Sequence, residues 1–254
     1  MNILVSNDDG ITAKGIIELV KALSGSANVF VAAPHSQMSA NSHAITLGKN
    51  IFARKVEFPH AKDALEVKGT PADCVKVGIQ VFEEEGHKID MVFAGINMGS
   101  NLGNDTLYSG TVGAAMEGAL FGKPSVAVSV DNHTATHFEG ACSLAVQTID
   151  LVYGKISANT VININVPDIP REAIKGVKFT KLGTRYYDDR FHLVGEKDGF
   201  TEYKLSGEPA DFTGGGMEYD VAAIANNYAS ITPLQFDFTD HKMMDQVAEW
   251  QLEI

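Results

Sequence analysis

Two adjacent carboxylates, Asp8 and Asp9, follow a short apolar stretch near the start of the chain and stand before Gly10 (MNILVSNDDG). The pattern predicts a buried strand that leaves its sheet at the acidic pair, followed by an amphipathic helix. In open α/β sheets the loops at the C-terminal edge of the strands converge into a ligand-binding crevice. Two like charges held side by side favour a hard divalent cation between them. We therefore expect a metal site here, in preference to a simple helix cap.

A glycine-rich segment at residues 95–113 is the second candidate for chemistry. Its glycines alternate with the polar residues Asn97, Asn101, Asn104, Ser109 and Thr111. Ser109, Gly110 and Thr111 stand where a helix is predicted to begin, so free N–H groups and the helix dipole can receive an anion such as phosphate. The segment lacks the lysine of a Walker loop and the spacing of the GxGxxG fingerprint. The alternative is a tight loop whose glycines only let a strand and a helix pack together.

A cation beside a phosphate indicates phosphoryl chemistry. A metal held by Asp8 and Asp9 could neutralise phosphate oxygens and lower the pKa of a bound water until hydroxide is available near neutral pH. Neutral oxygen ligands are also at hand, because Asn97 ends a predicted strand and Ser39 lies in a long polar loop. We predict that these four residues bind the metal, that Asp8, Asp9 and Asn97 are catalytic, and that Asn97 also contacts phosphate.

Other polar residues near these segments are weaker candidates for the site. His35 and His43 share the loop of Ser39, and His43 could contact phosphate or protonate a leaving group, although an exposed loop histidine is the commoner case. Asp105 could orient water or substrate, or it could only form an Asx turn. Asn101 is a further candidate for lining the site.

Alternating strand and helix patterns predict the elements that position these residues. Buried strands are expected at residues 27–33, 89–97, 125–130 and 160–167, and helices at residues 71–82, 111–122 and 136–153. Residues 47–58 have an extended character that suggests strands outside the parallel core. Thr70 is a plausible helix N-cap. We therefore predict an α/β fold with a mostly parallel sheet.

The pattern changes near residue 176. Strand pairs and turns follow, including a hairpin at residues 184–205, then a helix, a turn and a strand at residues 220–234, and a terminal amphipathic helix after Asp240. We divide the chain into a catalytic core, residues 1–175, and a hairpin-rich extension, residues 176–254, whose late strand returns to the core.

Composition narrows the range of partners. The 254 residues carry 32 acidic and 20 basic side chains, a formal charge of −12, which disfavours polymeric nucleic acid but not a small phosphorylated substrate. We see no signal-peptide pattern or apolar run of membrane-spanning length, and expect a soluble, cytoplasmic protein. Cys74 and Cys142 fall in helical patterns and are expected to be reduced and without a role.

Several motifs together resemble the SurE survival proteins, metal-dependent phosphatases that act on nucleoside monophosphates. The resemblance covers nearly the whole chain and rests on ILVSNDDG near the start, Ser39, GTPADCV at 69–75, AGINMGSNLGNDTLYSGTVGAAMEG at 94–118 and SITPL at 230–234. It implies 5′- and 3′-nucleotidase activity, a Rossmann-like three-layer core, and homodimers or homotetramers made by exchanged C-terminal elements. It also implies one divalent cation per subunit, magnesium or manganese, on Asp8, Asp9, Ser39 and Asn97, with phosphate at residues 109–111.

Two positions depart from the family pattern. Ala40 stands where members usually have glycine after the metal-binding serine, which predicts a small change in the backbone angles of that loop. Asn227 replaces a common glycine before SITPL, and asparagine tolerates left-handed backbone angles better than most residues. Neither change removes a proposed ligand.

Four other mechanisms or functions compete with hydrolysis by a metal-activated water. A covalent aspartyl-phosphate usually needs carboxylates two residues apart, whereas Asp8 and Asp9 are adjacent. A signalling receiver needs an acceptor Asp after a central strand, where this chain has Asn97. A zinc deacetylase needs a histidine ligand near the acidic pair, where Ser6 and Asn7 stand instead. A non-catalytic nucleotide or metal sensor would keep the same loop and stays open.

Overall fold

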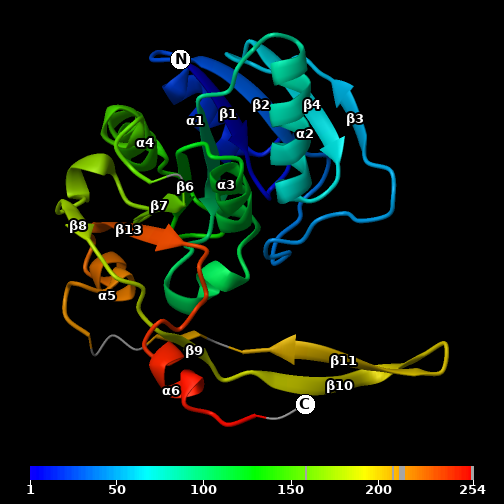
Figure 1. The fold of residues 1–254 in the computed structure, drawn as a ribbon, viewed down its shortest axis with the longest axis vertical. Coiled ribbons are helices and arrows are strands. Elements are labelled where there is room, and N and C mark those ends of the chain that lie inside the picture. The colour runs from blue at the N-terminus through cyan, green and yellow to red at the C-terminus, as the bar shows by residue number, and fades with distance from the viewer. Residues whose placement is uncertain (158, 208, 212–214, 253–254) are drawn as a thin grey trace.

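One mixed sheet of nine strands forms the centre of the protein (Figure 1). We describe it from a computed structural model, which covers residues 1–157, 159–207, 209–211 and 215–252. The strands are β1 (Asn2–Ser6), β2 (Asn28–Pro34), β3 (Phe52–Lys55), β4 (Asp63–Lys68), β5 (Met91–Met98), β6 (Ser125–Val130), β7 (Thr160–Val166), β8 (Val177–Phe179) and β13 (Ala229–Gln235). Their order is β3-β4-β2-β1-β5-β6-β7-β13-β8.

The inner strands, from β4 to β7, pair in parallel, and the outer part of the sheet is mixed. β3 runs antiparallel to β4, and β13 runs antiparallel to β7. Strands covered on both faces are mostly apolar, and all six residues of β6 are buried, as are Ile3 to Ser6 in β1. The parallel pairing brings the C-terminal ends of β1, β5 and β6 to one edge.

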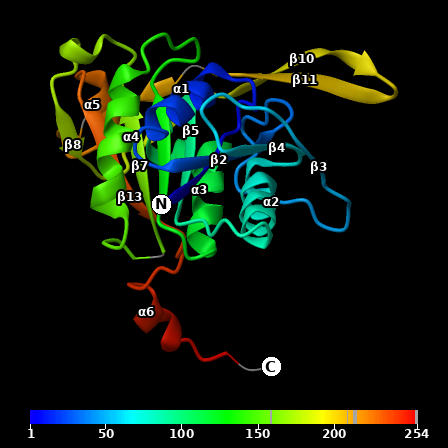
Figure 2. The same cartoon turned by 90° about the horizontal axis from the view of Figure 1, so that it is seen from above.

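Helices cover both faces of the sheet, which gives three layers (Figure 2). Helices α1 (Lys14–Leu23) and α4 (Glu139–Val152) pack on one face, and α2 (Pro71–Glu84) and α3 (Gly110–Leu120) pack on the other. Thr70 is the N-cap of α2, as predicted, and forms a capping box with Asp73 while Pro71 occupies the first helical position. The predicted α/β fold with a mostly parallel sheet is confirmed.

The segment after residue 176 contributes both to the sheet and to an arm. β8 and β13 belong to the main sheet. The remaining elements are the 3-10 turns η1 (Gly103–Leu107) and η2 (Arg171–Ala173), the strands β9 (Arg185–Tyr187), β10 (Arg190–Lys197), β11 (Phe200–Ser206) and β12 (Pro209–Asp211), and the helices α5 (Asp220–Ala225) and α6 (Met244–Ala248). The division at residue 175 itself stays a prediction.

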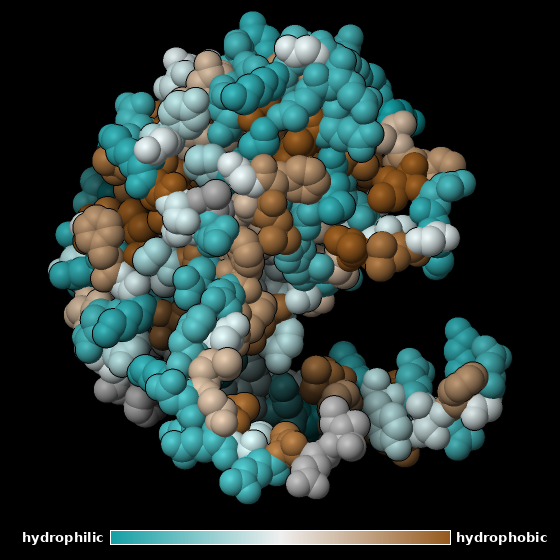
Figure 3. All heavy atoms as spheres, in the orientation of Figure 1, coloured by the Kyte–Doolittle hydropathy of each residue, from teal (hydrophilic) through white to brown (hydrophobic). Residues whose placement is uncertain are grey.

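Strands β10 and β11 form an antiparallel ribbon that projects from the body. Figure 3 shows an open gap between this ribbon and the body. The predicted hairpin is therefore present. The predicted terminal helix is short, since α6 spans five residues and buries none of them. Within the described residues, none of the helices is long and apolar enough to cross a membrane.

Candidate functional site

Asp8 and Asp9 lie directly after β1, at the edge of the sheet where the parallel strands end. The Asp8 side chain is almost fully buried, with 3% of its surface exposed, and Asp9 is half-buried. Burial raises the pKa of Asp8 to about 6, against a hydrogen bond from Thr111, and the charge of Asp9 adds to the rise. Burial also raises the pKa of Asp9. A cation beside this pair would stabilise both ionised carboxylates.

The first turn of α3 lies against Asp8. The Thr111 hydroxyl donates a hydrogen bond to Oδ1 of Asp8 at 2.5 Å, and the Ser109 hydroxyl caps the helix by accepting from the Val112 N–H at 3.0 Å. A Cβ on Gly110 would lie only 2.9 Å from both Cβ and Oδ2 of Asp8, so this approach requires glycine. The structure thus brings the predicted anion-binding turn and the first predicted metal ligand together.

Asn97 reaches the same edge from β5, the neighbour of β1 in the sheet. Its Nδ2 donates to the carbonyl of Gly99 at 2.7 Å, and no side-chain or backbone donor of the described residues bonds to its Oδ1. The next residue, Met98, donates its backbone N–H to Oδ2 of Asp9 at 3.2 Å. Asn97 therefore stands on the strand next to β1, one residue before the backbone contact to Asp9, and its amide oxygen has no hydrogen-bond partner among the described residues.

Ser39 arrives from the long loop between β2 and β3 rather than from a strand end. The Met38 N–H donates to the backbone carbonyl of Asp8 at 2.7 Å, which holds the loop against the acidic turn. Gln37 donates to the Ser39 hydroxyl at 3.0 Å and also hydrogen-bonds Asp9, which opposes the rise in the pKa of Asp9. Ser39 is exposed, and its link to Asp9 runs through Gln37, which is a partner of both residues.

The two departures from the family pattern both take left-handed backbone angles. Ala40 has φ +57° and Asn227 has φ +65°. Glycine adopts this region freely, asparagine with modest cost and alanine with more. The loop after Ser39 therefore keeps a conformation suited to glycine although the residue is alanine.

His43 does not lie free in its loop. Its Nε2 is 2.7 Å from Oε2 of Glu117, a residue of α3 with only 4% of its surface exposed, and Lys76 from α2 binds the other oxygen of Glu117 at 2.8 Å. His35 pairs with Glu66 at 2.7 Å. Both histidines therefore tie the loop to the body, and their roles toward a ligand stay predictions.

Asn101 belongs to a buried polar network that holds the glycine-rich segment. Its Nδ2 donates to Ser129 at 2.8 Å, its backbone N–H donates to Asn165 at 2.7 Å, and its carbonyl accepts from Asn163 at 2.9 Å. The hydrogen bonds of Asn101 are therefore made to β6 and β7. A role in fixing the loop explains this residue without a contact to a ligand.

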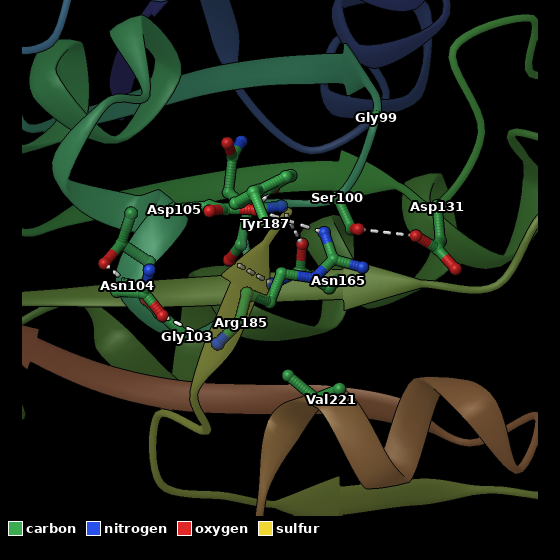
Figure 4. Close-up of polar contacts among 12 residues, drawn as sticks. Gly99, Ser100, Gly103, Asn104, Asp105, Asp131, Asn165, Arg185, Tyr187 and Val221 are labelled. Carbon is green, nitrogen blue, oxygen red and sulfur yellow. Dashed lines mark hydrogen bonds and ion pairs between the residues drawn. The ribbon is translucent and has the colours of Figure 1, made fainter. Parts of the chain in front are cut away.

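Asp105 in η1 faces the base of the arm. Figure 4 shows Arg185 and Tyr187 of β9 pointing toward it. The Tyr187 hydroxyl and Nη1 of Arg185, the latter at 3.2 Å, both donate to Oδ2 of Asp105. Asn104 accepts the backbone N–H of Arg185 at 2.7 Å. Asp105 thus links the segment leading to Ser109 with the chain leading to the ribbon.

One residue at this edge has no counterpart in the predictions from sequence. His133 lies three residues after β6, and a Cβ on Gly99 would be 2.6 Å from its Cε1 and 2.7 Å from its Nδ1. The imidazole therefore packs on Gly99, two residues from Asn97, and its charge opposes the rise in the pKa of Asp9. One feature of the sequence could have indicated His133 as a site residue, namely its position just after a predicted parallel strand.

The ligands predicted from the sequence have the chemistry of a site for a hard divalent cation. They are oxygens of two carboxylates, an amide and a hydroxyl, which suit Mg²⁺ or Mn²⁺ rather than a thiolate-bound metal. Within the described part of the chain, His, Cys, Asp and Glu side chains form no cluster of three or more that could hold a metal. Any metal at this edge would therefore depend on neutral oxygen ligands beside the two aspartates.

A mostly parallel α/β sheet with an acidic pair and the start of a glycine-rich helix at its C-terminal edge is typical of proteins that bind a ligand at that edge. The chain belongs to the SurE family, because the family model described as "Survival protein SurE" matches residues 3–189.

Individual relatives agree with this assignment over nearly full length. The protein named 5′-nucleotidase SurE of Heliobacterium modesticaldum is 42% identical over 253 residues, which cover 98% of this chain and 92% of the relative. The protein of the same name in Ruthia magnifica is 40% identical, with both chains covered completely. The crystal structure of the SurE protein of Aquifex aeolicus superposes with a TM-score of 0.83 at 36% identity, over 97% of this chain and 98% of that one.

Proposed function

We propose that this chain is a metal-dependent phosphomonoesterase that hydrolyses nucleoside 5′- and 3′-monophosphates to nucleoside and phosphate in the cytoplasm. The observation that carries the proposal is the contact between Asp8 and the start of α3, where Thr111 and Gly110 touch the carboxylate. The Asp8 carboxylate suits a cation, and the N-terminal end of α3 suits an anion. The relatives named 5′-nucleotidase support the choice of substrate.

Asp8, Asp9, Ser39 and Asn97 would hold the cation, with magnesium or manganese as the expected metals. When bound, such a cation neutralises phosphate charge and lowers the pKa of a water molecule. The buried aspartates are suited to hold it because their raised pKa values reflect an unfavourable environment for unpaired charge.

The chain's own groups orient the phosphate. Backbone N–H groups at residues 109–111 lie at the positive end of α3, so they can bind phosphate oxygens and hold the ester at the acidic edge. Asn97 can donate or accept at the same place. Asp8 is buried and its Oδ1 already accepts from Thr111, which favours a fixed anchor over a nucleophile that must reach phosphorus.

The same proposal includes assembly into a homodimer or homotetramer through the arm. Opposite residues of β10 and β11 place four exposed apolar side chains on one face of the ribbon, namely Phe191, Leu193, Tyr203 and Leu205. An isolated two-stranded ribbon is at best marginally stable in water, and a contiguous apolar face is typical of an interface. A second copy of the chain is the expected partner.

Phosphate release from a panel of 5′- and 3′-nucleotides tests the activity. We expect release with Mg²⁺ or Mn²⁺, none after EDTA, and recovery when metal is restored. Asp8→Asn and Asp9→Asn should abolish turnover with the fold retained, whereas Asp150→Asn, at an exposed position of α4, should not. If no nucleotide gives metal-dependent phosphate release, the phosphatase proposal is wrong and a non-catalytic nucleotide-binding or metal-binding function is favoured. Full activity of Asp8→Asn or Asp9→Asn would refute the metal site.

A further inference from the structure

His133 stands at the end of a third parallel strand. β1, β5 and β6 are neighbours in the sheet, and their C-terminal ends lead to the acidic pair, to Asn97 and to His133 respectively. Side chains that follow adjacent parallel strands face a common crevice. The position of His133 therefore follows from the same topology that places the predicted ligands.

The contacts of Gly99 fix the imidazole beside Asn97. Gly99 donates its N–H to the carbonyl of Val130 at 2.9 Å, and its own carbonyl accepts from Asn97 at 2.7 Å. The His133 ring covers the Cα of Gly99 so closely that a Cβ there would lie 2.6 Å from Cε1. Gly99 has φ +114°, a backbone conformation that residues with a side chain rarely adopt.

His133 also differs from the other loop histidines near this edge. His35 is paired with Glu66, His43 with Glu117, and His137 with Asp168. The side chain of His133 makes no hydrogen bond or ion pair within the residues that the structure describes, and it is exposed. Its ring nitrogens are therefore open to a ligand at the mouth of the site.

We propose that His133 is the proton donor to the leaving oxygen of the phosphomonoester. The inference rests on the proposed phosphatase function. As the oxygen of water forms a bond to phosphorus, the bond between phosphorus and the ester oxygen breaks, and its electron pair passes to that oxygen. The imidazolium N–H gives its proton to the same oxygen, which leaves as an alcohol. The neutral imidazole then regains a proton from solvent, which also takes up the proton lost by the attacking water.

This role answers a chemical need of the proposed substrates. The ribose oxygen of a nucleotide is a strongly basic alkoxide if it leaves without a proton, so general acid catalysis accelerates its departure. A 4-nitrophenolate ion is stable at neutral pH and needs no proton. The identity of the leaving group therefore separates proton donation from any effect of His133 on binding or folding.

The test compares His133→Gln with wild type on 5′-AMP and on 4-nitrophenyl phosphate, each with Mg²⁺ or Mn²⁺. We expect kcat on 5′-AMP to fall about 100-fold or more, and kcat on the aryl phosphate to stay within about threefold. Across a series of alkyl and aryl phosphates, kcat of the variant should depend more steeply on the pKa of the leaving alcohol. His137→Gln is the matched control from the same loop and should behave as wild type on both substrates.

Each outcome bears on one claim. Equal losses on both substrates would show a structural or binding role and overturn the proposal, as would an unchanged kcat on 5′-AMP. If wild type releases no phosphate from any nucleotide, the proposed phosphatase function itself is wrong. That result differs from one in which wild type is active and His133→Gln has the same ratio of activity on 5′-AMP to activity on 4-nitrophenyl phosphate, which would contradict only the role of His133. A loss confined to KM would likewise contradict proton donation.

Discussion

The Thr111 hydroxyl donates a hydrogen bond to Oδ1 of Asp8 at 2.5 Å, and this bond joins the first turn of α3 to the end of β1 across 103 positions of the chain. It directly connects the carboxylate that suits a cation with the helix start that suits an anion. Its removal should therefore affect both folding and turnover.

Thr111→Val keeps the shape of the side chain but removes the donor. The buried Asp8 carboxylate then loses its only side-chain donor among the described residues, and we expect the free energy of unfolding to fall by about 1–3 kcal/mol and kcat/KM for 5′-AMP to fall with it. Urea denaturation and steady-state kinetics measure the two effects. Thr111→Ser keeps the hydroxyl and should stay near wild type, and equal behaviour of the Val and Ser variants would show that the bond contributes little.

Glu117 gives the fold a predictable dependence on pH. Burial opposes its ionisation, but hydrogen bonds from His43 and Lys76 outweigh burial and lower the pKa of Glu117 below its ordinary value of 4.5. Because the folded-state pKa is the lower one, ionised Glu117 stabilises the fold above about pH 4.5, and this contribution is lost as the pH falls through the folded-state pKa.

Glu117→Gln should therefore destabilise the protein at pH 7 and lose this disadvantage as the pH falls below 4.5 and through the folded-state pKa of Glu117. Thermal unfolding of both proteins from pH 7 to pH 3 measures the difference in Tm, which should shrink as the pH falls. Glu57→Gln, at an exposed position, is the control and should show no such trend. A difference in Tm that is constant across this range would contradict the assignment.

Ala40 carries a conformational cost that glycine would remove. A left-handed φ costs alanine about 1–2 kcal/mol, against an entropy cost of about 0.5–1 kcal/mol for glycine. Ala40→Gly should raise the free energy of unfolding by about 0.5–1 kcal/mol, because φ is +57° at this position. Ala44→Gly in the same loop lacks that benefit and should lower it, so a loss in both variants would argue against strain at Ala40.

The limits of sequence reasoning follow from the range of the interactions. The strand at residues 125–130 was predicted with both ends correct because four of its six residues are apolar, and a parallel strand buried on both faces is mostly apolar. Asp8, Asp9 and Asn97 were predicted as site residues because they stand at the C-terminal ends of such strands. The partners of Asp105 lie 80 and 82 positions away in the chain, and no local pattern reports such contacts. The same holds for His133, whose relevance depends on packing against Gly99.

The apolar face of the ribbon predicts the state of assembly. Phe191→Ser combined with Leu205→Ser removes an opposed pair from that face, and we expect the mass in sedimentation velocity to shift toward smaller species. His192→Ser combined with Lys204→Ser alters the neighbouring pair on the opposite face and is the matched control. A wild-type protein that sediments as a monomer would contradict assembly through the arm.

Asp105 connects the arm with the segment that leads to Ser109. Its Oδ2 accepts from Arg185 and Tyr187, while its Oδ1 is buried without a hydrogen-bond partner among the described residues, so the carboxylate depends on these contacts. Asp105→Asn removes the charge that Arg185 faces. We expect a loss of about 1–3 kcal/mol in stability and a raised KM for 5′-AMP, because η1 would shift the turn that receives phosphate. Asp188→Asn breaks an exposed pair with Arg190 and should cost less than about 1 kcal/mol with KM unchanged. If the two variants have the same KM, the base of the arm does not position the phosphate segment.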